Sequence, residues 1–131
     1  MAHFVELNSA NEVLRVIVIN NHEIVDDNGV EQESIGVQLC NNLLGGTWKQ
    51  TSYNSRIRGN YAFEGFTYFV DQDLFMPPKP YNSWLMNTAD ATWQAPSPMP
   101  TDGQSFSPSR IYDWDEDNQT WINVSGASAG G

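Results

Sequence analysis

Residues 112–121, with the sequence YDWDEDNQTW, carry the side chains in this chain that are best suited to chemistry. Four of these ten residues are acidic, and Tyr112, Trp114 and Trp121 add three large rings. Closely spaced carboxylates can ligate Ca²⁺, and acids beside exposed rings can form a recognition surface. The same residues around a turn can also form a solvated hairpin tip.

The calcium interpretation fails on its spacing. If Asp113 is the first position of an EF-hand loop, Asp115 and Asp117 fall at positions three and five. Position six is then Asn118, where the loop needs glycine, and position twelve is Val124, where it needs a bidentate glutamate. We therefore expect no metal site here, and we expect the acids to occupy a solvated hairpin tip.

No other cluster of residues indicates catalysis. His3 and His22 are the only histidines, and neither has a neighbouring residue pattern typical of a catalytic triad or a zinc site. Cys40 is the single cysteine, which excludes an intrachain disulfide. The glycine pair 45–46 follows a predicted helix, whereas phosphate-binding glycines precede one. We expect a protein that is not an enzyme and uses no cofactor.

The charge of the chain argues against nucleic-acid binding. Sixteen acids against six bases give a formal net charge of −10, which would repel a phosphate backbone. The best candidate for a basic patch is the group Lys49, Arg56 and Arg58, which we interpret as the solvated face of a strand.

The longest apolar run near the N-terminus, residues 16–19, is too short for a signal peptide or a membrane span. We therefore expect no nucleic-acid or membrane partner.

The N-terminal part of the chain predicts a strand, a turn and a second strand. The strands fall at residues 4–7 and 13–19, with a polar turn between them. The second run, VLRVIVI, is apolar on both faces except for Arg15. This composition is typical of a strand that is covered on both sides, so we expect it to be the best-buried strand.

A helix is predicted at about residues 31–44. Ile35, Leu39 and Leu43 recur at a spacing of four, acids lie in the first turn, and Gly45 follows the last turn. Gly36 is unfavourable in the middle of a helix. We expect this helix to be the one substantial helix of the chain and to pack across the N-terminal sheet.

Three later segments share one pattern and predict three β-hairpins. Segments 66–75, 84–93 and 112–121 each have large residues at positions one, three and ten around a polar middle. Positions one and three share a strand face, and a short turn returns position ten across from them. Proline-rich runs at 76–80 and 95–100 predict extended connectors. The large residues are Phe66, Tyr68 and Phe75, then Trp84, Met86 and Trp93, then Tyr112, Trp114 and Trp121.

These elements predict an α+β fold that is mainly β. Short, twisted antiparallel strands and hairpins would combine with one helix packed on the N-terminal sheet. A chain of 131 residues suits one globular domain, which we place at residues 1–124. Its strand–strand–helix part is residues 1–46, and its aromatic hairpin part is residues 47–124. Residues 125–131, SGASAGG, predict a flexible tail.

Four segments of the chain resemble a known protein family. They are MAHFVELNSANEVLRVIVINNHEI, GGTWKQTSYNSRIRGNYAFEGFTY, MPPKPYNSWLMN and WQAPSPMPTDG. Together they are similar to a small family of virion structural proteins encoded by marine tailed phages, cyanophages among them. The resemblance covers nearly the whole chain, from Ala2 to about Trp121, and it implies no catalytic residue.

The resemblance implies a non-enzymatic structural component of a tailed-phage virion, assembled in the host cytoplasm. The first interpretation is a capsid decoration or cement protein that binds the major capsid protein or another virion protein, with self-association also open. The alternative is a tail, neck or fibre accessory, which would allow binding to host-surface glycans.

Among the tryptophans, we assign Trp48, Trp84 and Trp93 to packing. The candidate interface residues are Tyr81, Tyr112, Trp114 and Trp121.

Overall fold

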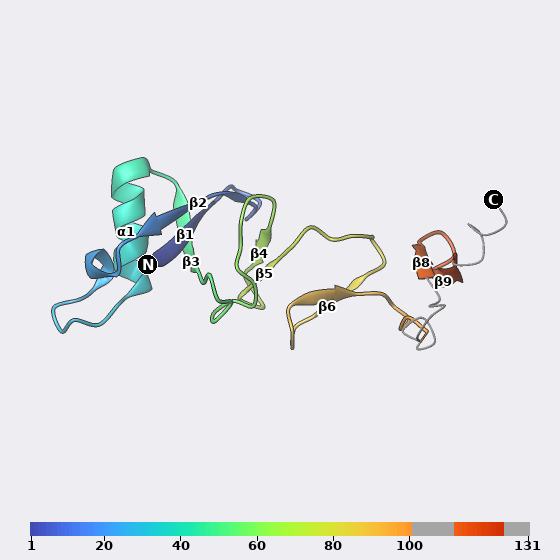
Figure 1. The fold of residues 1–131 in the computed structure, drawn as a ribbon. Coiled ribbons are helices and arrows are strands. Elements are labelled where there is room, and N and C mark those ends of the chain that lie inside the picture. Colours follow the sequence, from blue (N-terminus) through green and yellow to red (C-terminus); the bar gives the residue numbers. More distant parts are fainter. Residues whose placement is uncertain (101–111, 125–131) are drawn as a thin grey trace. The chain divides into compact units, whose positions relative to one another are not determined.

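The computed structural model describes residues 1–100 and 112–124. These residues form nine strands, one α-helix and one 3-10 helix, and the strands lie in small antiparallel sheets (Figure 1). The predicted α+β, mainly β class is therefore confirmed. The predicted tail at residues 125–131 lies outside the described residues.

The chain divides into two compact units. Unit 1 consists of Met1–Pro78 with Thr88–Thr92, and unit 2 consists of Lys79–Asn87 with Trp93–Gly131. Residues 77–80 and 95–100 contain no helix or strand, as predicted for the two proline-rich runs, whereas Met76 of the first run belongs to a strand. Prolines cannot donate a hydrogen bond to a strand ladder, which accounts for the interruption.

Unit 1 is built on a three-stranded antiparallel sheet. Its strand order is β2 (Val13–Ile19), β1 (Ala2–Leu7) and β3 (Thr47–Thr51), so β1 is the central strand. The prediction that β2 is the best-buried strand is wrong, because β2 is an edge strand and Leu14 and Val18 are 47% and 51% exposed. The apolar run of β2 consists largely of β-branched residues, which favour a strand even where one face is not covered.

Helix α1 (Glu33–Leu44) packs on one face of this sheet, close to its predicted bounds. The residue that follows the helix is Gly45, whose positive φ of 69° favours glycine. Its buried residues are Gly36 and Cys40, whereas Leu43 on the predicted stripe is 70% exposed. Leu39 of the same stripe is partly buried against the core, and the ring of Phe4 occupies the space where a Cβ at Gly36 would lie.

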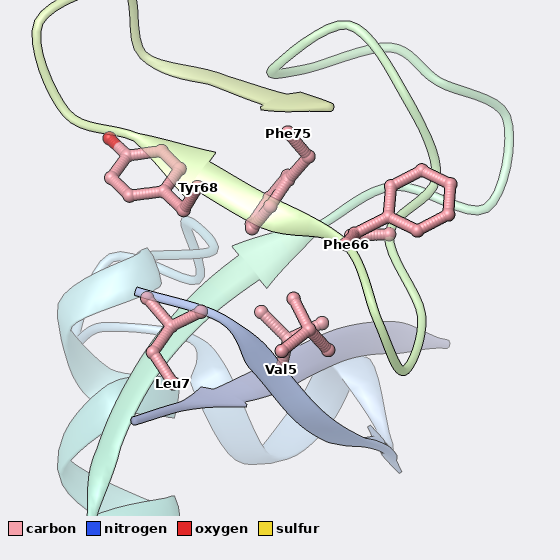
Figure 2. Packing of buried hydrophobic residues seen from close by; sticks show 7 residues of the cluster. Val5, Leu7, Phe66, Tyr68 and Phe75 are labelled. Carbon is pink, nitrogen blue, oxygen red and sulfur yellow. The ribbon is translucent and has the colours of Figure 1, made fainter. Parts of the chain in front are cut away.

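The two faces of the sheet carry separate apolar clusters. Alternation along β1 sends Phe4 to the helix side and Val5 and Leu7 to the opposite side. Figure 2 shows Val5 and Leu7 beneath Phe66, Tyr68 and Phe75. The helix-side cluster comprises Ala2, Phe4, Ile19, Cys40 and Trp48 together with Ile24 of the 3-10 helix η1 (Asn21–Ile24).

The three predicted hairpins are present. They pair β4 (Thr67–Phe69) with β5 (Leu74–Met76), β6 (Leu85–Asn87) with β7 (Thr92–Gln94), and β8 (Tyr112–Asp115) with β9 (Thr120–Asn123). In the first and third hairpins, positions three and ten are cross-strand partners, as predicted: Tyr68 faces Phe75, and Trp114 faces Trp121.

The hairpins also share a backbone conformation that their side chains do not predict. Position eight of each repeat has a positive φ: 53° at Asp73, 57° at Ala91 and 50° at Gln119. A left-handed residue at the end of a four-residue turn returns the chain to the second strand. The three segments therefore repeat the same turn with different residues.

An ion-pair network anchors the long loop that follows β3. The Arg58 guanidinium donates hydrogen bonds to Asp73 Oδ1 and Glu33 Oε1, both at 2.8 Å, and to the backbone oxygen of Gln50 at 2.9 Å. The Tyr68 hydroxyl donates a hydrogen bond to the same Asp73 oxygen. The Arg58 side chain is only 12% exposed, so the prediction of a solvated strand face is wrong for Arg58. The network joins α1, β3 and the β4–β5 turn.

Candidate functional site

The third hairpin fixes the two tryptophans that the sequence singles out. Trp114 on β8 and Trp121 on β9 are directly opposite, and their ring centroids lie 5.2 Å apart at an angle of 69°. Edge-to-face packing of this kind is favourable for aromatic rings. Cross-strand pairing therefore gives both rings a defined position in unit 2.

Trp84 and Tyr81 extend this pair into an aromatic cluster. The Trp84 ring lies 6.1 Å from Trp114 and 6.2 Å from Trp121, and Tyr81 lies 5.7 Å from Trp84. We call these four residues the tryptophan cluster. Three of the four predicted interface residues, Tyr81, Trp114 and Trp121, are thus brought together, and Trp84, which we assigned to packing, is at their centre.

Glu116 connects the hairpin turn to the segment before β6. Its carboxylate accepts hydrogen bonds from the Ser83 hydroxyl at 2.6 Å, the Ser83 backbone N–H at 3.0 Å and the Trp114 indole N–H at 2.8 Å. The bonds from Ser83 and from Trp114 lower the pKa of Glu116, because they stabilise the charged form. This acid therefore positions Trp114 and the preceding segment.

The other acids of the segment act within the turn itself. Asp113 accepts a hydrogen bond from the Trp114 backbone N–H at 2.9 Å, and Asp115 accepts one from the Asn118 side-chain amide at 2.7 Å. Among residues 1–100 and 112–124, no group of three or more His, Cys, Asp or Glu side chains could hold a metal ion. Asp113 and Asp115 thus bond to their own hairpin, as acids near turns commonly do.

Trp114 is buried within the cluster and is 5% exposed. The prediction that its ring occupies the surface is therefore wrong, because two neighbouring indoles and Glu116 enclose it. Tyr81, Tyr112 and Trp121 are half-buried. Trp48 is buried in unit 1, as predicted, whereas Trp84 and Trp93 are half-buried.

An open cleft of about 550 Å³ lies beside the tryptophan cluster in unit 2. Its walls are formed by aromatic, proline and methionine side chains, and the Trp121 indole N–H donates to the backbone oxygen of Ser97 at 2.9 Å. This hydrogen bond holds one wall against the 95–100 connector. The apolar lining residues are Trp84, Trp93, Ala95, Pro96, Pro98, Met99 and Trp121.

Lys79 lies beside Trp93, which lines the cleft, and Met99 exposes its thioether there. The Lys79 ammonium lies 5.3 Å from the centre of the Trp93 ring, within range of a cation–π interaction. Met99 is 36% exposed in the described structure. Tryptophan and methionine are enriched in protein–protein interfaces, where few charges are buried at the centre. The cleft thus has the composition of a contact surface. The sequence located the 95–100 connector, but its contact with Trp121 joins residues 24 positions apart and has no periodic signal.

No family model matches the chain, and neither a curated protein nor a solved structure is significantly similar to it. Among the described residues, no helix has the length and apolar character that a membrane span requires.

Proposed function

We propose that this protein is a non-enzymatic structural component of a tailed-phage virion, and that it decorates the capsid by binding the major capsid protein. The resemblance to phage virion proteins supports the setting. The single observation that supports binding is the cleft of unit 2, which presents half-buried tryptophans, prolines and an exposed methionine around about 550 Å³. Such side chains form the anchors of protein interfaces.

The charge of the chain suits this role. A net charge of −10 keeps a protein soluble at the high local concentration that assembly of many copies requires. Many identical sites on a shell also make weak individual contacts sufficient, because the contacts act together. A single cleft of modest size in each copy is then enough.

A charge placed in the cleft tests the proposal. Met99→Asp introduces a carboxylate at an exposed cleft position, and we expect it to lower binding to capsids that lack the protein by about tenfold, the effect of about 1.4 kcal/mol. Val70→Asp is the matched control, because Val70 is 61% exposed in the β4–β5 turn of unit 1. Co-sedimentation with purified capsids measures both variants.

Comparison with Val70→Asp shows which results would contradict the proposal. Equal binding by wild type and Met99→Asp would exclude the cleft as the contact surface. Equal loss in both acidic variants would show that added negative charge, rather than its place, weakens binding. Attachment at the tail or neck instead of the shell would favour the accessory role.

A further inference from the structure

A second pocket, of about 330 Å³, lies in unit 1 beside the start of β1, the end of β3 and the loop that follows β3. Its volume is at the lower end of the range for small-molecule sites, about 300–1,000 Å³. In a chain with sixteen acids, none of the described residues that line this pocket is Asp or Glu. Its local charge therefore differs in sign from that of the chain as a whole.

The Arg56 guanidinium supplies positive charge at this pocket. The ion pairs of the described residues engage Arg15 with Glu6, and Arg58 with Glu33 and Asp73, but within these residues Arg56 pairs with no carboxylate. Arg56 is exposed at the pocket rim. A guanidinium with unused donors binds a carboxylate through two parallel hydrogen bonds.

Amide side chains line the same pocket. Gln50 uses its backbone N–H and oxygen to bond Glu33 and Arg58, and no hydrogen bond within the described residues engages its side-chain amide. Asn54 also lies in the wall. Asn21 contributes a buried Oδ1 atom without a hydrogen-bond partner. Buried acceptors are normally satisfied, so this oxygen is available to accept a hydrogen bond from a hydroxyl or N–H donor.

Aromatic rings form one side of the pocket. Tyr53 is 68% exposed and stacks on His3 with centroids 5.9 Å apart and an interplanar angle of 28°. The centroid of the Tyr61 ring lies 5.3 Å from that of Tyr53 and 5.5 Å from that of His3, and these contacts hold both rings in place. Partial burial and the nearby N-terminal charge lower the pKa of His3, so at neutral pH the imidazole is uncharged.

We propose that this pocket binds an acidic sugar, namely a pyranose ring that carries one carboxylate. The apolar face of the ring packs on Tyr53, its hydroxyls bond to Asn21 and Gln50, and its carboxylate pairs with Arg56. Arg56 is the one charged side chain among the described lining residues, and several amides surround it. This combination fits one carboxylate on a hydroxyl-rich ring better than a multiply charged phosphate, which the net charge of −10 repels. This proposal does not rest on the virion role or on the cleft of unit 2.

Titration of the full ¹⁵N-labelled chain with glucuronate, glucose and inorganic phosphate tests the proposal. We expect glucuronate to shift the amide resonances of Gln50, Tyr53 and Asn54 with a Kd on the order of 1 mM. Glucose should bind at least several-fold more weakly, and phosphate should not shift these resonances.

Arg56→Gln removes the charge and keeps an amide, so glucuronate binding should weaken about tenfold while glucose binding is unchanged. Arg15→Gln, on β2 outside the pocket, is the matched control and should bind glucuronate as the wild type does. Tyr53→Leu should weaken both sugars. No shifts at the pocket, equal binding of glucose and glucuronate, tighter binding of phosphate, or equal losses in Arg56→Gln and Arg15→Gln would each overturn the proposal.

Discussion

At the residue scale, single side chains decide which elements meet. Glu116 is the clearest case in unit 2, because one carboxylate bonds Ser83 before β6 and Trp114 on β8. Arg58 has the same role in unit 1, where it joins α1 to the β4–β5 turn. Neither role is visible in the sequence, since Ser83 lies 33 positions from Glu116 and Glu33 lies 25 positions from Arg58.

Gly36 should be intolerant of a side chain. A Cβ at this position would overlap the Phe4 ring, so Gly36→Ala should destabilise unit 1 by about 1–3 kcal/mol, although alanine favours helices by about 1 kcal/mol. Gln38→Ala, at an exposed position of the same helix, is the control. Urea unfolding measures both, and a Gly36→Ala protein as stable as wild type would contradict this packing.

Asp73 should make unit 1 sensitive to acid. Hydrogen bonds from Tyr68 and Arg58 lower the pKa of Asp73 below its ordinary value of 3.8. The unfolded chain then binds the proton more readily, so this stabilisation is fully present above about pH 5 and is lost as the pH falls through the folded pKa.

Asp73→Asn should reduce that acid-dependent loss, and asparagine also tolerates the positive φ at this position. Asp71→Asn, in the same turn without an ion pair to Arg58, is the control. Thermal unfolding between pH 3 and pH 7 measures the effect. An unchanged slope of Tm against pH in Asp73→Asn would exclude this account.

At the element scale, the hairpins depend on a left-handed residue at their eighth position. Gln119 is exposed and has a φ of 50°, a conformation that costs an L-residue about 1–2 kcal/mol and costs glycine little. Gln119→Gly should therefore stabilise unit 2 by about 0.5–1 kcal/mol after the entropy of the unfolded glycine is counted.

Gln119→Val gives the opposite test, since a β-branched residue tolerates a positive φ poorly. Thermal unfolding monitored by near-ultraviolet circular dichroism of the tryptophans measures both variants. If Gln119→Val were as stable as Gln119→Gly, the third turn would not depend on its backbone conformation.

The hairpins also show what sequence can and cannot predict. Spacing alone predicted that Trp114 would face Trp121 and Tyr68 would face Phe75, because cross-strand register follows from turn length. The helix bounds followed from its terminal glycine. The buried face of α1 and the burial of Trp114 could not be predicted, because both depend on partners distant in sequence: Phe4 for Gly36, and Trp84 for Trp114.

At the scale of the whole molecule, each unit presents its own surface. Unit 2 has an apolar cleft bounded by tryptophans, and unit 1 has a polar pocket without acids. Assembly on a shell would use the first surface, and capture of an acidic sugar would use the second. Because the two surfaces share no lining residue, variants in one should leave binding at the other unchanged.

We propose that the protein is a repeated component of a virion shell, and its copy number in purified particles tests this proposal most directly. Quantitative mass spectrometry of purified particles of a phage whose genome encodes the chain, with the major capsid protein as the internal reference, gives the number of copies per particle. A decoration protein that follows the shell lattice should be present at hundreds of copies, in a fixed ratio to the major capsid protein. Absence from the particle, or a number in the range of a single tail or neck ring, would contradict the account.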